Sequence, residues 1–311
     1  LGNVHEELNV THLDFNTIKK IPIEKMKNLK EVSFVGNFGD PLMNPELDKI
    51  VSFFHKQQIS ISTNASLRGV EWWKQLGTNS NIRVTFCIDG FEDTHKLYRR
   101  NTSYKKIMEN AKSFINAGGN ARWQFIVFKH NEHQIEEAKT LSENMGFNKI
   151  NFMYSDRFDI DSKFKVYENN KYLYDLEKGS KQKLLRERLN SEKGEKYWKE
   201  LNAKKSNITC AWSKEKKIYI HSDSTVYPCC MLGSIQSGKK IEQLMLKKII
   251  KDVRKIDLNY NTFEDIINSD VFTKALPESF DEKPFSHPIC IEWCNKNTGK
   301  YVNAGLNTVN T

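Results

Sequence analysis

Five of the six cysteines lie in the last third of the sequence, in positions from which they could bind a metal together. Cys210 precedes the segment KIYIHSDSTVYPCC, which has the pattern of a β-hairpin and ends with Cys229 and Cys230. Cys290 and Cys294 follow much later, with three residues between them. Four thiolates from three separate segments can surround one tetrahedral centre, either a structural zinc ion or a four-iron cluster.

The two adjacent cysteines leave the fourth ligand open. Successive side chains in a strand point to opposite faces, so neighbouring cysteines rarely bind the same ion. We expect Cys229 to be the ligand and Cys230 to pack inward as a small apolar residue. Cys87 stands alone in an apolar strand and is expected in the core. The predicted metal ligands are Cys210, Cys229, Cys290 and Cys294.

Polar residues also follow a series of apolar strands in the first half of the chain. After a weak helix at 16–26, strands are expected at 31–35, 59–62, 83–88, 122–128 and 149–154. Helices expected at 44–55, 70–76, 102–117 and 131–145 separate these strands. This alternation implies a parallel sheet with helical crossovers, which binds ligands at the carboxyl ends of its strands.

The composition limits the class of protein. The 311 residues are 38% hydrophobic and 28% charged, which describes a soluble globular protein. The sequence contains no apolar run of the length that a membrane span needs, and its first residues are too polar for a signal peptide. Clustered cysteines in such a chain suit a reducing compartment, so we expect a cytoplasmic protein. Much of the net charge of +9 comes from lysines in 163–205, which we interpret as a solvated surface.

The sequence divides into three parts by pattern. Residues 1–155 form the alternating sheet domain, 156–207 a charged connector whose stretch 181–201 is expected to be helical, and 208–311 a cysteine-rich domain. In the last part, a turn is expected at 221–224, and helices are expected at 241–253 and 262–276.

Taken in order, the polar strand ends resemble the cofactor-binding motifs of the radical S-adenosylmethionine superfamily. Gly39-Asp40-Pro41, with Gly36 upstream, resembles the end of the Gly-Gly-Glu-Pro motif that binds the methionine amine. Asp40 stands where glutamate is usual, and it keeps the negative charge on a side chain that is shorter by one methylene. Thr63-Asn64-Ala65 resembles the Thr-Asn-Gly motif of the next strand.

The later strand ends continue this resemblance. Cys87-Ile88-Asp89-Gly90 resembles the Ser-x-Asp-Gly motif, with cysteine in place of serine. The resemblance places Asp89 near the ribose or the amino-acid end of the cofactor. His95…Arg99-Arg100 resembles a His…Arg stretch in which an arginine can pair with the cofactor carboxylate. Gln124, in the next strand, is the last predicted cofactor contact.

The resemblance implies a fold and an activity. The fold would be α/β, a partial (β/α) barrel with a small cysteine-rich α+β domain of the SPASM or twitch type, which holds an auxiliary [4Fe-4S] cluster. The enzyme would be an iron–sulfur oxidoreductase that generates a 5′-deoxyadenosyl radical from S-adenosylmethionine and abstracts a hydrogen atom. Its substrate would be a peptide, a protein or a small molecule, and a flavodoxin or ferredoxin would donate electrons.

The sequence departs from this family in one defining feature. The loop Cys-x-x-x-Cys-x-x-Cys, which holds the cofactor-reducing [4Fe-4S] cluster, does not occur in it. We expect this loop upstream of Leu1, in which case the chain is a fragment that is inactive by itself. One alternative is a non-catalytic pseudoenzyme. Another is a zinc protein that binds nucleic acid through the lysine-rich connector, although the scarcity of arginine there argues against a nucleic-acid partner.

Overall fold

The computed structural model describes residues 11–36, 39–155, 158, 163–182, 208–234, 246–281 and 288–294. These residues belong to two compact units. The first unit comprises the described residues from 28 to 182, and the second comprises 11–27 together with 208–294. Each unit has its own fold and is described by itself.

A five-stranded parallel sheet forms the centre of the first unit. Its strands are β1 (Glu31–Phe34), β2 (Gln58–Thr63), β3 (Ile82–Cys87), β4 (Asn120–Val127) and β5 (Lys149–Tyr154). They lie side by side in chain order, and every neighbouring pair is parallel. Parallel neighbours in chain order require a crossover after each strand, so the loops after the strands all begin at the same edge. This arrangement confirms the predicted α/β architecture of a partial barrel.

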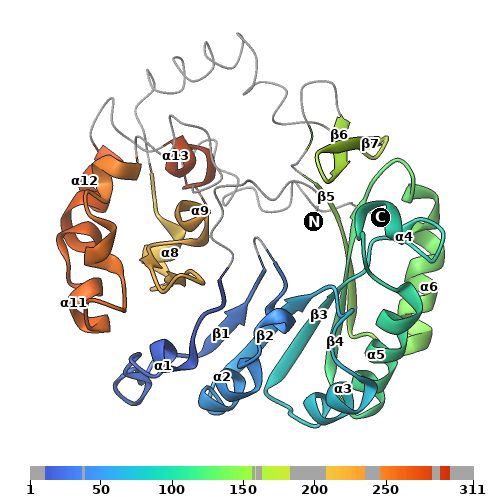
Figure 1. Cartoon of the computed structure of the whole chain (residues 1–311), viewed down its shortest axis with the longest axis horizontal. Coiled ribbons are helices and arrows are strands. Elements are labelled where there is room, and N and C mark those ends of the chain that lie inside the picture. Colours follow the sequence, from blue (N-terminus) through green and yellow to red (C-terminus); the bar gives the residue numbers. More distant parts are fainter. Residues whose placement is uncertain are drawn as a thin grey trace. The chain divides into compact units, whose positions relative to one another are not determined.

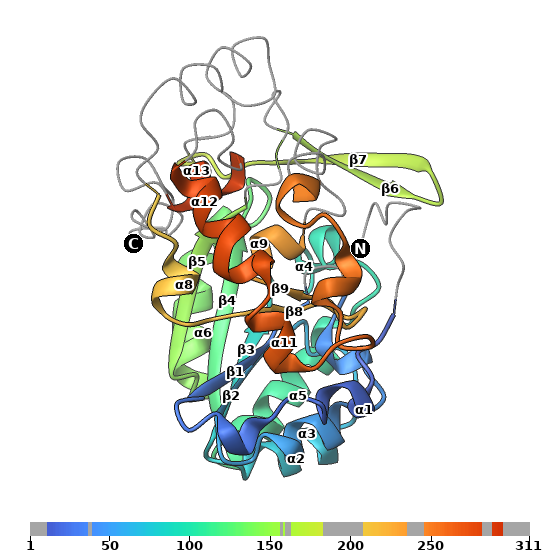
Figure 2. The same cartoon turned by 90° about the vertical axis from the view of Figure 1, so that its left-hand side faces the viewer.

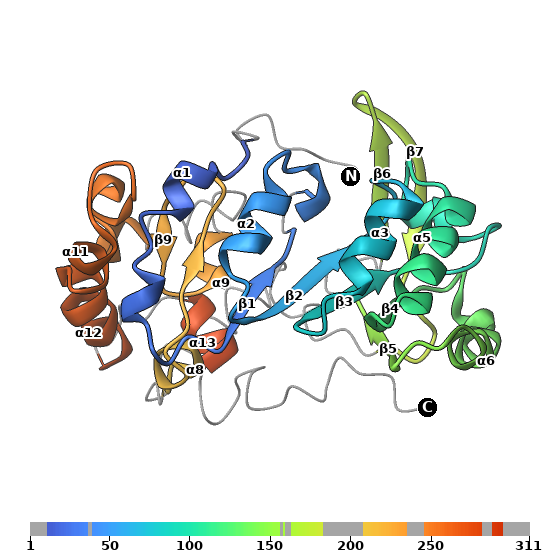
Figure 3. The ribbon, with the colours of Figure 1, turned by 90° about the horizontal axis from the view of Figure 1, so that it is seen from below.

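Helices lie along one face of this curved sheet, as Figures 1 and 3 show. The helices of this unit are α2 (Leu47–Phe53), α3 (Val70–Gly77), α4 (His95–Tyr98), α5 (Tyr104–Asn116) and α6 (Ile135–Met145). Short 3-10 turns occur at Pro41–Met43 and Glu132–Gln134. The chain ends α6 at Gly146, whose φ of 87° lies in the left-handed region that favours glycine.

The two faces of the sheet differ in chemistry. On the helix side the strands contribute fully buried apolar side chains, among them Ile61, Val84, Phe86, Trp123 and Phe125. Most of the alternate residues point to the opposite face and are partly buried or exposed, whereas Cys87 at the end of β3 is buried. Many of these are small or polar: Ser33, Ser60, Ser62, Thr85, Gln124 and Asn151. The fold therefore presents a polar inner face beside the strand ends.

A long hairpin extends the first unit beyond the sheet. Strands β6 (Lys163–Glu168) and β7 (Lys171–Glu177) pair antiparallel, and Figure 2 shows them as a projecting ribbon. Their turn consists of Asn169 and Asn170, with φ values of 48° and 62°. Val166 and Leu176 of the hairpin join Phe128 in a small buried cluster, so the hairpin is anchored at the end of β4. This hairpin was not predicted within the charged connector.

The second unit consists of short helices around a two-stranded hairpin. Its hairpin joins β8 (Tyr219–Ile220) and β9 (Val226–Tyr227) through the predicted turn at 221–224. Its helices are α1 (Phe15–Ile18), α8 (Ala211–Lys214), α9 (Cys230–Gly233), α11 (Phe263–Ile267), α12 (Leu276–Asp281) and α13 (Pro288–Cys294). Short 3-10 turns occupy Ile23–Lys25 and Val253–Ile256, and a π-helical turn occupies Val271–Ala275.

Two bonds tie the early segment 11–27 to this second unit. The Lys20 ammonium donates to the Leu258 carbonyl at 2.8 Å, and Lys25 pairs with Glu264 at 3.1 Å. The single helix predicted at 16–26 is instead a helical turn followed by a 3-10 turn, because Pro22 interrupts it. The domain boundaries near 155 and 207 remain predictions, since residues beside them lie outside the described ranges, as does most of the helix predicted at 181–201.

Candidate functional site

Asp40 connects the ends of the first two strands. Its carboxylate accepts a hydrogen bond from the Thr63 hydroxyl, at 2.8 and 2.9 Å to its two oxygens, and one from the Asn64 backbone N–H at 2.8 Å. It also accepts from the Leu42 N–H at 2.9 Å, which caps the 3-10 turn that begins at Pro41. Both oxygens are thus bonded to protein donors, and the carboxylate fixes the two strand ends relative to each other.

Glycine is required at one position of the first strand end. A side chain at Gly36 would collide with the backbone carbonyl of Gly39, which lies too close to leave room for a Cβ. A side chain at Gly39 would meet open space. Among the predicted cofactor contacts, Gly36, Asp40 and Pro41 therefore shape the turn. Gly39 is the one whose outer side is open to a ligand.

The third strand end contains a buried ion pair. The Asp89 side chain is 0% exposed, accepts from the Ile126 N–H at 2.6 Å and pairs with Arg99 Nε at 2.6 Å. Burial by itself would lower the pKa of the Arg99 guanidinium, but the adjacent Asp89 carboxylate outweighs it and raises that pKa. Asp89 is therefore occupied by protein groups, and its carboxylate orients Arg99.

The two neighbouring arginines have different partners. Arg100 donates to the Tyr167 carbonyl at 3.0 Å and pairs with Glu168, so it holds the β6–β7 hairpin. Arg99 donates a hydrogen bond to Asp89 through Nε, and 23% of its side-chain surface is exposed. Of the two, Arg99 is the one placed to present its outer amino groups to an anionic ligand.

His95 also contacts the end of the third strand, β3. Its Nδ1 accepts from the Asp89 N–H at 3.2 Å, and its Nε2 lies 3.1 Å from the Thr102 hydroxyl. Since that hydroxyl donates to the Arg99 carbonyl, the His95 Nε2–H is the donor to Thr102 and the ring is neutral. Burial lowers the pKa of His95 to about 3, which agrees with this assignment.

Gln124 lies on the polar inner face of the sheet. In the sheet register it stands beside Cys87 of β3 and Asn151 of β5. Cys87 is 8% exposed, as predicted for a core residue, and burial raises the pKa of its thiol to about 11. Asn151 was missed by the sequence analysis. Period-two alternation in the strands, with polar residues at every second position, was the signal that could have identified this face.

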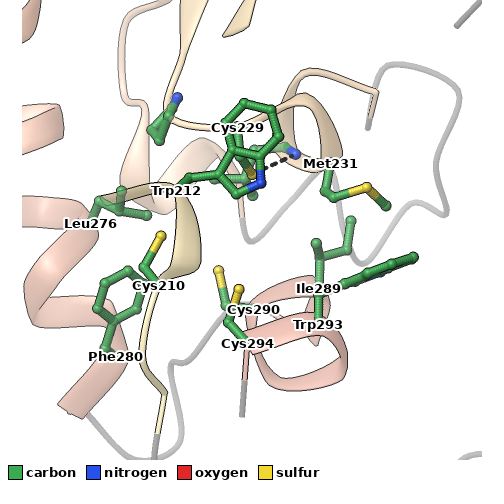
Figure 4. A pocket seen from close by; sticks show the side chains of 12 residues that line it. Cys210, Trp212, Cys229, Met231, Leu276, Phe280, Ile289, Cys290, Trp293 and Cys294 are labelled. Atoms are coloured by element: carbon green, nitrogen blue, oxygen red, sulfur yellow. Dashed lines mark hydrogen bonds between the residues drawn. The ribbon is translucent and has the colours of Figure 1, made fainter. Parts of the chain in front are cut away.

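The four predicted cysteine ligands line one cavity in the second unit. Cys210 precedes α8, Cys229 lies between β9 and α9, and Cys290 and Cys294 lie on one face of α13. Figure 4 shows their side chains surrounding a common space. Cys230 does not line this cavity. The remaining lining is hydrophobic and aromatic: Trp212, Pro228, Met231, Leu232, Leu276, Phe280, Ile289 and Trp293.

The thiols differ in their surroundings. A hydrogen bond with Cys294 lowers the pKa of Cys210 to about 6, whereas burial raises the pKa of Cys229 to about 12 and also raises that of Cys290. Cys229 Sγ accepts from the Leu232 N–H at 3.5 Å as the cap of α9. Among the described residues, no three His, Cys, Asp or Glu side chains converge closely enough to hold a single ion. Four cysteine thiols are the ligand set of either a zinc ion or a four-iron cluster.

A sheet with polar strand ends, followed by four cysteines around an apolar cavity, defines a cofactor-dependent protein with an auxiliary metal domain. Residues 11–165 match the family model of the radical SAM superfamily, and residues 210–296 match that of an iron–sulfur cluster-binding domain, SPASM. The chain belongs to the radical SAM superfamily and carries a C-terminal SPASM domain. Its two parts thus belong to families that bind S-adenosylmethionine and an iron–sulfur cluster.

Solved structures share this fold at low sequence identity. The structure of anSMEcpe with bound AdoMet has a TM-score of 0.52 and 14% identity over 92% of this chain and 82% of that chain. The structure of anSMEcpe with AdoMet and the Cp18Cys peptide has a TM-score of 0.51 and 15% identity, over 91% and 81%. SuiB of Streptococcus suis bound to S-adenosylmethionine has a TM-score of 0.48 and 14% identity over 90% of this chain.

The chain spans 61% of the length of that SuiB chain. No curated protein sequence matches it. None of the helices in the described part of the chain is long and apolar enough to cross a membrane.

Proposed function

We propose that this chain is the cofactor-binding and auxiliary-cluster part of a radical S-adenosylmethionine enzyme that modifies a peptide. The observation that carries the proposal is the presence, in one chain of this family, of a sheet with three polar strand ends and a cavity ringed by four cysteines. S-adenosylmethionine, when bound and reduced, supplies a 5′-deoxyadenosyl radical that abstracts a hydrogen atom from the substrate.

The strand ends would hold the cofactor in a defined orientation. Gly39 leaves room for the methionine end, and the Asp40 bonds to Thr63 and Asn64 keep the first two strand ends in place. Arg99 would pair with the cofactor carboxylate through its outer amino groups. We assign Asp89 a positioning role, since its carboxylate holds Arg99 and the Ile126 backbone.

The four cysteines would bind the auxiliary cluster. Their apolar surroundings exclude water, which protects a cluster and tunes its potential. The cluster would bind the substrate or accept an electron from it. Because all six cysteines are free thiols, the proposed enzyme suits a reducing compartment such as the cytoplasm, with a flavodoxin or ferredoxin as electron donor.

Reduction of the cofactor needs a second cluster. The three-cysteine loop that would hold it does not occur among the 311 residues, so we propose the radical step for a protein in which that loop precedes this chain. The residues of this chain would bind and orient the cofactor whether or not that loop is present.

The polar inner face of the sheet supports a peptide as substrate. Serine, threonine and amide side chains along β1 to β5 offer donors and acceptors at regular intervals, which suits an extended backbone. One structure of similar fold contains a bound peptide, which agrees with this choice.

Calorimetric titration of the whole chain tests the cofactor site. S-adenosylmethionine should bind at least about tenfold more tightly than decarboxylated S-adenosylmethionine, which lacks only the carboxylate, since a bond to a charged group contributes about 1.5–3 kcal/mol. Arg99→Gln, in an Asp89→Asn background that removes its buried partner's charge, should abolish this difference. Arg100→Gln, which affects only the hairpin contact, should preserve it. Equal binding of both ligands to the unmodified chain would refute the site.

A further inference from the structure

The cysteine cavity contains a buried hydrogen-bond donor that lacks an acceptor. Trp212 follows Cys210 by two residues and lines the cavity together with all four predicted ligands. Its indole nitrogen is buried and has no hydrogen-bond partner among the residues that the structure describes. In Figure 4 this nitrogen faces the space between Cys229 and the other three thiols.

A buried N–H group without an acceptor is destabilising, and native proteins rarely retain one. The rest of the lining offers no strong acceptor, because it consists of hydrophobic and aromatic side chains and the four cysteines. A phenylalanine would fill the same space with one aromatic ring and no donor. The acceptor for the Trp212 N–H is therefore expected in the metal centre that the four cysteines bind.

We propose that the Trp212 N–H donates a hydrogen bond to a sulfur atom of the auxiliary cluster, either a cysteine thiolate or a bridging sulfide. This inference rests on the proposed function, which places the cluster among these four cysteines. A donor at sulfur offsets negative charge and stabilises the reduced cluster more than the oxidised one. Hydrogen bonds to sulfur are among the factors that set cluster potentials. Trp212 thus raises the reduction potential and makes the cluster a better electron acceptor.

The second tryptophan of the cavity provides a matched control. Trp293 lines the same cavity from α13, and its indole nitrogen is buried as well, but its ring points away from the four thiols (Figure 4). Trp293→Phe therefore makes the same chemical change in the same cavity without removing a donor that faces the sulfur atoms. A general effect of lost packing would appear in both variants, and a specific hydrogen bond only in Trp212→Phe.

The test is an anaerobic redox titration of the reconstituted chain, monitored by electron paramagnetic resonance, with iron and sulfide content measured for each sample. Trp212→Phe should keep its iron and sulfide and become about tenfold harder to reduce, a fall in midpoint potential of about 59 mV for one electron. Trp293→Phe should keep the unmodified potential. Equal potentials in the unmodified chain and Trp212→Phe, both with full cluster content, would overturn the proposal while leaving the cluster assignment intact.

Two further outcomes are separated by the same measurements. If Trp212→Phe fails to hold a cluster, replacement of Trp212 by benzothienylalanine keeps the shape of the ring and lacks the N–H. A lowered potential in that variant supports the hydrogen bond, and an unchanged potential refutes it. If the unmodified chain takes up no iron and sulfide, the cluster assignment fails, and the role of Trp212 fails with it.

Discussion

Replacement of Asp40 by asparagine separates a structural role of this carboxylate from a direct contact with the cofactor. Asparagine keeps the shape of the side chain and one acceptor oxygen. Its NH2 group, however, replaces the second carboxylate oxygen and would then face donor groups, with which it cannot form hydrogen bonds. The carboxylate accepts from the buried Thr63 hydroxyl and from the N–H groups of Leu42 and Asn64. Bonds to charged groups contribute about 1.5–3 kcal/mol each, and we expect a net loss of about 2 kcal/mol as one or two are replaced.

Hydrogen exchange measured by mass spectrometry reports this loss at the strand ends themselves. A loss of about 2 kcal/mol corresponds to about 30-fold faster exchange in the peptides that contain Leu42 and Asn64. Asp252→Asn is the matched control, because Asp252 caps an exposed 3-10 turn, where asparagine is an equally good cap. It should leave exchange unchanged throughout the sheet.

Cofactor binding by the same variant completes the test. Because both Asp40 oxygens are bonded to protein groups, S-adenosylmethionine affinity should change by no more than about threefold, less than one charged bond would contribute. The reasoning is refuted if affinity falls more than tenfold while exchange of Leu42 and Asn64 stays normal. That combination would mean that the carboxylate contacts the cofactor directly.

Three further changes have definite expected outcomes. Gly36→Ala should disrupt the first strand end and destabilise the fold by about 1–3 kcal/mol in denaturant titration, whereas Gly39→Ala should not, since only the first collides with backbone. Burial lowers the pKa of His95 to about 3 from an unfolded value near 6.5, so its stabilisation is present above about pH 6.5 and is lost as the pH falls toward 3. Stability should drop by about 2 kcal/mol between pH 7 and 5, and His95→Gln should remove most of that slope. Ser224 has a φ of 78°, which glycine adopts more easily than serine. Ser224→Gly should therefore add about 0.5–1 kcal/mol to the free energy of unfolding and raise the melting temperature. An unchanged melting temperature would argue against strain at this turn.

The sheet was predictable from sequence because local pattern determines it. Alternating strand and helix segments gave each of β1 to β5 to within about two residues, since buried parallel strands are short apolar runs bounded by polar loops. The polar inner face was hidden in the same strands. Its residues, such as Ser62 and Asn151, look like ordinary exposed positions until the register places them side by side.

The partners of the polar strand ends could not be predicted, because they come from distant parts of the chain. Asp89 and Ile126 are 37 residues apart, and no local pattern links that carboxylate to that amide. The β6–β7 hairpin did have a local signal. Two asparagines with positive φ separate strands in which Phe164, Val166, Tyr174 and Leu176 recur at every second position. The high lysine content of this segment concealed it.

The choice between the adjacent cysteines shows what side-chain alternation in a strand can predict about a metal ligand. The expectation that only one of the pair faces the metal rested on the geometry of a strand. In the structure Cys229 lies between β9 and α9, and Cys230 begins that helix. Cys229 lines the cavity and Cys230 does not, but the choice of Cys229 as the metal ligand stays a prediction.

The most direct test of the account is anaerobic reconstitution of the chain with iron and sulfide, with metal and sulfide analysis of cysteine variants. The unmodified chain and Cys230→Ala should each hold about four iron and four sulfide per chain, the content of one cluster bound by four cysteines. Cys229→Ala should lose most of both. Stoichiometric zinc without sulfide in the unmodified chain, or loss of the cluster in Cys230→Ala but not in Cys229→Ala, would contradict the assignment.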